Sequence, residues 1–229
     1  SLSPVDYSQY WCTYYPIDAK IWVQTSDAYY SRTEYTGGDG KIPKADFPNF
    51  YLAGSSNSSG STVTKFKYFP FDSTSATTDF KGAWEDCSGL TEFPMIDTSK
   101  GTNFSNAWRN CQSLSELPML DLHNGTYFGS AWQYCNNLTS LPALNLSSGT
   151  NFMSAWYYCE NLTNLGGFGA IKESIDLHWS TKLTVESLMN VINQAATVTG
   201  KTMTLGSDNL AKLSDEQKAV ATSKGWTLA

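Results

Sequence analysis

Residues 80–103 read FKGAWEDCSGLTEFPMIDTSKGTN, and residues 104–127 read FSNAWRNCQSLSELPMLDLHNGTY. The same apolar positions return at 128–151 and again from residue 152, always 24 residues apart. A spacing kept by several residue types at once indicates an internal repeat, which has to be recognised before local structure is assigned. Five columns keep this spacing: Phe80, Phe104, Phe128 and Phe152; Ala83, Ala107, Ala131 and Ala155; Trp84, Trp108, Trp132 and Trp156; Cys87, Cys111, Cys135 and Cys159; Leu90, Leu114, Leu138 and Leu162.

The register also marks where the array begins and ends. In degenerate form it reaches back to residues 63–78, which we interpret as a partial first coil. After Leu165 a glycine-rich segment, 166–169, replaces the proline-bearing segment, so the regular array ends there. Inside the array the downstream columns are Phe93, Leu117, Leu141 and Leu165; Pro94, Pro118 and Pro142; Ile96, Leu120 and Leu144; and Gly-Thr pairs at 101, 125 and 149.

A repeat of 20 to 29 residues with recurring leucines is typical of one short strand plus a return segment per coil. We therefore expect an α/β solenoid, a short leucine-rich-repeat array of 24-residue coils. One coil cannot bury its apolar columns alone, so each Trp, Cys and Leu should lie against its equivalent in the next coil. Strands about 4.8 Å apart would make residues 63–180 a rod on the order of 20 to 25 Å long.

The motif A-W/F-x-x-C-x-x-L-x-x-L, followed by a proline-bearing segment, resembles the BspA-like class of leucine-rich repeat. The resemblance covers roughly residues 63–180, with Trp where Phe is usual and Leu-Pro-x-Leu where many members have an uninterrupted Ile-x-Ile strand. Similar repeats occur in bacterial and protist surface proteins and in phage tail or receptor-binding proteins. The resemblance implies an extracellular, cell-surface or virion location, with a surface protein or glycan as partner.

The two ends of the chain do not share the register. Residues 1–62 are rich in Tyr and Trp and are expected to form a β-rich aromatic N-terminal cap or subdomain, which could also contact an assembly partner. Alternation in residues 19–24 predicts a strand, 37–40 a turn, and the Gly/Ser-rich stretch 54–60 a flexible loop or linker.

A strand-helix-strand-helix cap is expected at the C-terminal end, with residues 63–180 forming the array and 181–229 the capping segment. Alternation of Ile175, Leu177 and Trp179 predicts a strand, and a helix should start near Thr184 and end before Gly200. A second strand candidate spans 202–205. A capping box at Ser214 and Gln217 predicts a last helix, which stops at Gly225. A cap of this kind covers the open end of the core with a polar face.

Charge and hydropathy exclude two classes of partner. The net charge is −6 and no run of Lys or Arg occurs, so we expect no nucleic-acid partner. No stretch of about 18 apolar residues exists, so we expect no membrane insertion. No signal peptide is visible at Ser1. A cleaved one would leave no trace, so secretion is neither supported nor excluded.

No catalytic or cofactor motif is recognised. There is no G-x-S-x-G, P-loop or H-E-x-x-H sequence, and the pairs Glu85-Asp86 and Asp215-Glu216 lie in segments expected to be solvated, so we predict no enzyme. With no CxxC pair and only His123 and His178, no metal site or other cofactor is expected.

Two columns allow more than one interpretation. The repeat cysteines are expected to be buried thiols, with bridges 87–111 and 135–159 as the alternative, and Cys12 leaves an odd count. The Trp column is expected in the core, although an exposed sugar-stacking stripe would have the same spacing. Asp97, Asp121 and Asn145 are expected to cap turns rather than bind calcium, and the Asn-x-Ser/Thr triplets are interpreted as loop chemistry.

One position varies while the scaffold around it does not. The two residues between Trp and Cys read Glu-Asp at 85–86, Arg-Asn at 109–110, Gln-Tyr at 133–134 and Tyr-Tyr at 157–158. Tyr and Arg usually dominate contact energies. We therefore predict a non-enzymatic binding module that recognises a cell-surface ligand, glycan or protein, as an adhesin or phage receptor-binding protein. The alternative is a structural spacer or attachment module of a virion or cell envelope. The candidate ligand-binding residues are Arg109, Tyr134, Tyr157 and Tyr158.

Overall fold

The structure is a computed structural model that describes residues 78–93 and 95–229, together with the backbone of five short strands in the first 52 residues. These are β1 (Pro4–Asp6), β2 (Ile21–Gln24), β3 (Arg32–Glu34), β4 (Lys41–Pro43) and β5 (Phe50–Leu52). β1 pairs with β4, and β2 pairs with β3 and β5, all antiparallel. The strand expected in residues 19–24 is therefore confirmed as β2. The expected turn at 37–40, the loop at 54–60, Cys12 and the partial coil up to residue 77 lie outside the described residues.

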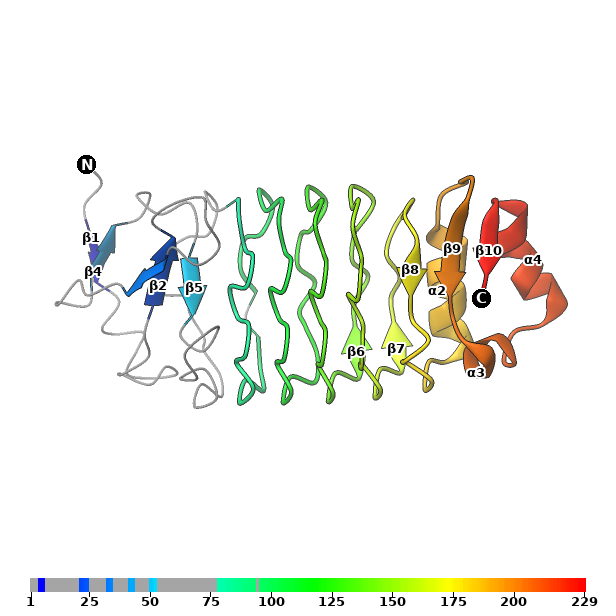
Figure 1. Cartoon of the computed structure of the whole chain (residues 1–229), viewed down its shortest axis with the longest axis horizontal. Helices are drawn as coiled ribbons and strands as arrows, with labels where there is room; N and C mark the ends of the chain where they lie inside the picture. Colours follow the sequence, from blue (N-terminus) through cyan, green and yellow to red (C-terminus); the bar gives the residue numbers. More distant parts are fainter. Residues whose placement is uncertain are drawn as a thin grey trace.

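From residue 78 onward, successive 24-residue units lie side by side along the long axis of the molecule (Figure 1). We number them unit 1 (80–103), unit 2 (104–127) and unit 3 (128–151), and unit 4 begins at Phe152. Parallel bridges join residues exactly one period apart at one corner, from Asp79 through Asn103 and Tyr127 to Asn151. At the leucine-proline segment, β6 (Ser140–Leu141) pairs in parallel with β7 (Asn164–Leu165). The repeat of the sequence is thus a repeat of backbone pairing.

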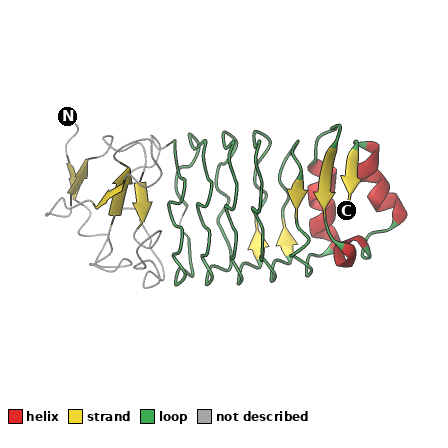
Figure 2. Ribbon diagram, viewed as in Figure 1, coloured by secondary structure: helices red, strands yellow, loops and turns green. Residues whose placement is uncertain are grey.

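The segment that carries the Trp and Cys columns is built from consecutive turns, which is why Figure 2 shows most of the array as loop. The Ala83 N–H donates to the Phe80 carbonyl within the unit, at 3.0 Å. Between units, the Gly82 N–H donates to the Ser105 carbonyl at 2.9 Å, and the equivalent bond recurs in each described pair of units. Hydrogen bonds within a unit therefore alternate with hydrogen bonds between units, so this segment forms neither a helix nor a long strand. Since prolines interrupt the other side of the unit, strands there stay short.

Two positions per unit adopt the left-handed backbone conformation with φ between 55° and 63°. Glycine, asparagine and aspartate tolerate this region, whereas most other side chains do so only at a cost. The first position holds Gly82, Asn106, Ser130 and Ser154, and the second holds Asp86, Asn110, Tyr134 and Tyr158.

The core consists of the columns expected from the register. The Trp, Cys, Ala and Leu columns are at most 1% exposed. Neighbouring indoles of the Trp column stack with ring centroids 5.2 to 5.6 Å apart and interplanar angles of 1° to 16°. The predicted burial of these columns is confirmed. The sugar-stacking alternative for the Trp column is wrong, because no face of these rings reaches solvent.

The four repeat cysteines are free and buried. Three of the thiols donate to the Trp carbonyls of the preceding unit: the Sγ–O distance is 3.2 Å from Cys111 to Trp84, 3.1 Å from Cys135 to Trp108 and 3.1 Å from Cys159 to Trp132. The 87–111 and 135–159 bridges are not formed. Each thiol instead fills a small apolar space, and those of Cys111, Cys135 and Cys159 also satisfy one backbone carbonyl each.

Beyond the array the chain forms three helices and a small sheet (Figure 1). β8 (Ile175–Asp176), β9 (Lys201–Thr204) and β10 (Trp226–Leu228) form a parallel sheet in the order β10-β9-β8. The helices are α2 (Val185–Gln194), α3 (Ser207–Leu210) and α4 (Asp215–Ser223). Thr184 caps α2, and Ser214 with Gln217 forms the capping box of α4, so both predicted helix starts are confirmed. α3 and β10 were not predicted, because each is too short to show a period.

Two lysines donate hydrogen bonds to backbone carbonyls in the C-terminal, helical part of the molecule. Lys224 Nζ donates to the carbonyls of Ile192, Asn193 and Ala195 at the end of α2, which carries no basic residue in its last turn. Lys212 Nζ donates to the carbonyls of Thr181 and Leu183, in the loop before α2. A cation at these carbonyls satisfies acceptors that a helix or loop end leaves unpaired.

Among the described residues, no helix is both long and apolar enough to span a membrane.

Candidate binding surface

The two residues between Trp and Cys in each unit form a continuous surface along the array, which we call the slot surface. Units of this kind stack in register, so the first slot residues follow one another from unit to unit, and the second ones do likewise. The first column is Glu85, Arg109, Gln133 and Tyr157, and the second is Asp86, Asn110, Tyr134 and Tyr158.

Units 1 and 2, with the first slot residue of unit 3, form a polar part of the slot surface. Arg109 Nη1 lies 2.9 Å from Glu85 Oε1, and Arg109 Nε donates to Gln133 Oε1 at 2.8 Å. In the second column, Asn110 Nδ2 donates to Asp86 Oδ1 at 2.8 Å. The Glu85 side chain is only 6% exposed, against 36% for Arg109. Arg109 therefore neutralises a nearly buried carboxylate, and this structural task was not expected from the sequence.

Units 3 and 4 form an aromatic part. Tyr134, Tyr157 and Tyr158 contact one another, and Tyr157 and Tyr158 also contact Trp179. We call these four residues the aromatic cluster. Tyr134 and Tyr158 stack at 5.4 Å with an interplanar angle of 26°, and Tyr158 and Trp179 stack at 4.1 Å with an angle of 21°. The three predicted tyrosines are thus brought together. Arg109 is not in ring contact with them and belongs to the polar part.

Trp179 was missed because its spacing differs from the repeat. It lies 21 residues after Tyr158, and the sequence Trp-Ser-x-x-Leu at 179–183 follows Tyr-Cys-x-x-Leu at 158–162 at that shorter distance. The Ser180 hydroxyl donates to the Cys159 carbonyl at 3.1 Å, and the Ser180 N–H bonds Leu177 as the Cys159 N–H bonds Trp156. The segment around Trp179 is therefore a shortened fifth unit. A search that allowed three deletions in the register could have found it.

His178 borders the aromatic cluster. Its ring centroid lies 5.0 Å from that of Trp179, and its Nδ1 lies 2.5 Å from Asp176 Oδ1. The Asp176 carboxylate also accepts the His178 backbone N–H at 3.1 Å. The carboxylate therefore fixes the imidazole and leaves Nε2 as its other polar atom.

The backbone at the second slot position is strained in the aromatic part. Asp86 and Asn110 suit a left-handed residue, but Tyr134 and Tyr158 adopt φ 60° in the same place. A tyrosine there costs about 1 to 2 kcal/mol that an asparagine largely avoids. The cost is met by contacts within the cluster, and residues held in such conformations concentrate at functional sites.

Tyr157 is a neutral phenol at neutral pH. Desolvation among the neighbouring rings raises the pKa of Tyr157 above 10.0, and the phenols of Tyr158 and Tyr134 and a hydrogen bond with Tyr158 raise it further. Tyr157 therefore offers ring area and a hydroxyl group, without a tyrosinate charge at neutral pH.

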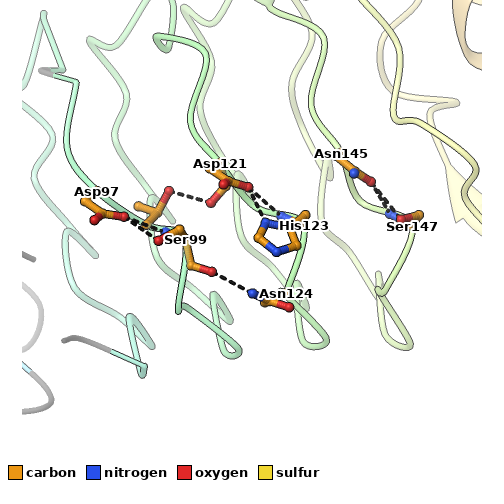
Figure 3. A network of polar contacts seen from close by, with 8 residues as sticks. Asp97, Ser99, Asp121, His123, Asn124, Asn145 and Ser147 are labelled. Atoms are coloured by element: carbon orange, nitrogen blue, oxygen red, sulfur yellow. Dashed lines mark hydrogen bonds and ion pairs between the residues drawn. The ribbon is translucent and has the colours of Figure 1, made fainter. Parts of the chain in front are cut away.

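Another polar network follows the turns at the Asp column (Figure 3). Asp97 Oδ1 accepts the Ser99 N–H at 3.0 Å, and Asn145 Oδ1 accepts the Ser147 N–H at 3.2 Å. Asp121 makes the same bond to His123 at 3.2 Å. The Ser99 hydroxyl and the His123 ring, each 2.6 Å from the same carboxylate oxygens, lower the pKa of Asp97 and Asp121 most, and the backbone bonds lower it further. The predicted turn-capping role is confirmed, since each side chain closes its own turn.

The described residues contain no cluster of three or more His, Cys, Asp or Glu side chains that could hold a metal ion. Burial raises the pKa of the Cys135 thiol to about 12. A thiol in that state is a poor nucleophile and a poor metal ligand at neutral pH.

Comparisons with protein-family models, with curated proteins and with solved structures found no match to this chain. Its function therefore has to be inferred from the slot surface itself.

Proposed function

We propose that the chain is a leucine-rich-repeat solenoid of the kind it resembles, the BspA-like class, and that it is a non-enzymatic module that binds a ligand on a cell surface. The aromatic cluster is the contact region. In this proposal the protein acts outside the cell or on a virion, as an adhesin or a phage receptor-binding protein, and its partner is a surface glycan or protein.

One observation carries the proposal: Tyr134 and Tyr158 have a left-handed backbone conformation. At the same position of the repeat, Asp86 and Asn110 adopt this conformation with less strain. Selection for stability alone favours Asp or Asn there. Half-buried Tyr and Trp residues on a rigid scaffold supply large contact areas at low entropic cost, as binding surfaces require. A structural spacer or attachment module, the alternative, does not require tyrosines at these positions, because Asp or Asn adopts the same backbone conformation with less strain.

The experiment uses side chains that the repeat itself accepts at these positions. In the unit-matched variant, Tyr134→Asn and Tyr158→Asn copy Asn110, and Tyr157→Gln copies Gln133. Adsorption of the labelled full chain is measured on intact Gram-positive and Gram-negative bacteria, yeast and erythrocytes. We expect the wild type to adsorb to at least one surface, and the variant to lose adsorption while keeping its melting temperature within a few degrees.

The control removes exposed apolar side chains elsewhere, with Met95→Ala and Met119→Ala, which are 63% and 62% exposed in the wild type. This variant should adsorb like the wild type. If the unit-matched variant adsorbs unchanged, or if the wild type adsorbs to none of the surfaces, the proposed function is wrong.

A further inference from the structure

The aromatic cluster has one ring whose orientation differs from the others. Tyr134, Tyr158 and Trp179 belong to three successive units and stack on one another, with Tyr158 in the middle. Both faces of Tyr158 are therefore covered. Tyr157 stands perpendicular to this stack, at interplanar angles of 81°, 81° and 73° to Tyr134, Tyr158 and Trp179.

The perpendicular contact determines which face of Tyr157 is free. In a T-shaped pair the edge of one ring meets the face of the other. Because Tyr158 has no face left, it supplies the edge and Tyr157 supplies the face, with centroids 4.6 Å apart. The opposite face of Tyr157 points away from the stack, and the residue is only partly buried.

Polar side chains precede and follow Tyr157 in the first slot column. Gln133 precedes Tyr157 in its column, and because its Oε1 accepts from Arg109, its amide nitrogen is turned away from that bond. His178 follows in the shortened unit, with Nδ1 engaged by Asp176 and Nε2 left over. The side chain of Tyr158 hydrogen-bonds with the Tyr157 phenol. An amide, an imidazole and a phenol can together donate to and accept from adjacent hydroxyl groups.

We propose that the outward face of Tyr157 stacks on the apolar face of a neutral saccharide, whose hydroxyl groups are bound by Gln133, His178 and Tyr158. The inference rests on the proposed function and names the class of its ligand. The negative face of an aromatic ring attracts the C–H groups of a pyranose ring. The side chains beside it offer both hydrogen-bond donors and acceptors, which suits the hydroxyl groups of a saccharide.

Two other occupants fit the geometry less well. Protein interfaces are enriched in exposed Met and other large apolar side chains beside their Tyr and Trp residues. The exposed large apolar side chains of the described residues all lie outside the slot surface: Met95, Met119, Tyr127, Met153 and Val185. A quaternary ammonium group needs several ring faces turned toward one space. Here three of the four rings turn their faces toward one another.

The experiment measures binding of the labelled full chain to an array of immobilised neutral oligosaccharides built from glucose, galactose, mannose and N-acetylglucosamine, with sialylated and sulfated sets alongside. We expect binding to a neutral member. Tyr157→Ala should weaken it at least about tenfold, because a ring contact of about 1.4 kcal/mol is lost. Tyr157→Phe keeps the ring and should stay within about threefold. Tyr127→Ala, which removes an exposed tyrosine outside the slot surface, should have no effect.

The source of adsorption is then tested on the cell surface that the wild type recognises. Periodate, which cleaves vicinal diols, should abolish adsorption, and protease treatment should leave it. If protease abolishes adsorption, periodate does not, and the unit-matched variant still fails to adsorb, the proposed function stands and the saccharide inference is overturned. Binding only to acidic glycans, or competition by choline, also overturns it. If the chain binds neither cells nor array, both proposals fall.

Discussion

The polar and aromatic parts of the slot surface have the same backbone and different chemistry. At the second slot position φ is 63° for Asp86, 62° for Asn110 and 60° for both Tyr134 and Tyr158. In units 1 and 2 the side chains suit this conformation and bond one another. In units 3 and 4 they do not suit it, and ring contacts stabilise them instead. A repeat scaffold can therefore hold a residue in an unfavourable backbone conformation when ring contacts with its neighbours along the stack stabilise its side chain.

The largest effect should come from the thiol column beneath both parts. The pKa of Cys135 is raised from 9.0 to about 12 by burial, and the pKa values of Cys87, Cys111 and Cys159 are raised in the same direction. A thiol whose pKa is higher in the folded chain contributes stability that is complete below pH 9 and is lost as the pH rises toward 12. Above pH 9, each thiol lowers the free energy of unfolding by up to about 1.4 kcal/mol per pH unit.

Urea unfolding midpoints measured at pH 8, 9, 10 and 11 test this effect. The wild type should lose stability steeply above pH 9. Cys135→Ala should start lower at pH 8, because it leaves a small cavity, but should decline with a shallower slope. Equal slopes for the two proteins would show that the buried thiol does not set the alkaline limit.

The next effect concerns the ion pair of the polar part. Arg109→Met keeps the apolar stem but removes the cation from Glu85, whose side chain is 6% exposed. We expect a loss of about 2 kcal/mol, below the 3 to 5 kcal/mol of fully buried pairs, because solvent screens the 36% exposed arginine. Gln133→Ala removes only a neutral acceptor and should cost less than about 1 kcal/mol. Chemical denaturation measures both, and equal losses would contradict the assignment of Arg109 to a structural role.

A smaller effect isolates the backbone strain of the aromatic part. Tyr158→Asn and Tyr158→Ala both remove the middle ring of the stack, but only asparagine tolerates φ 60° well. The asparagine variant should therefore be more stable by about 1 kcal/mol. The same pair of substitutions at Tyr127, which does not have a positive φ, provides the control and should show no such preference for asparagine. Equal stability of the two variants at position 158 would mean that the strain is relieved in another way.

The smallest effect is expected at the end of the stack. Tyr134→Asn gives up one stacked contact worth about 0.5 to 1.5 kcal/mol and relieves a similar strain. Thermal unfolding should place this variant within about 1 kcal/mol of the wild type. A loss of several kcal/mol would show that Tyr134 supports the core rather than the surface.

Much of the core could be predicted from the sequence, because burial in a repeat follows from a period of 24 that is visible in one chain. The Trp, Cys and Leu columns, the free thiols, the turn caps at Asp97 and Asp121 and the capping box at Ser214 are all local or periodic features. Three residues of the aromatic cluster could be named for the same reason. The fold class itself stays a prediction, with its coils supported by the parallel bridges one period apart.

What the sequence by itself determined is thus the register: which residues share a column and which columns vary. Only the tertiary structure decided which contacts the neighbours in a column make. It paired Arg109 with Glu85, placed Trp179 on Tyr158 through a unit three residues short, and put tyrosines into left-handed backbone positions. The physical reason is that a side chain in one unit meets its partner across the stack, where orientation, burial and backbone angle depend on packing that no single unit encodes.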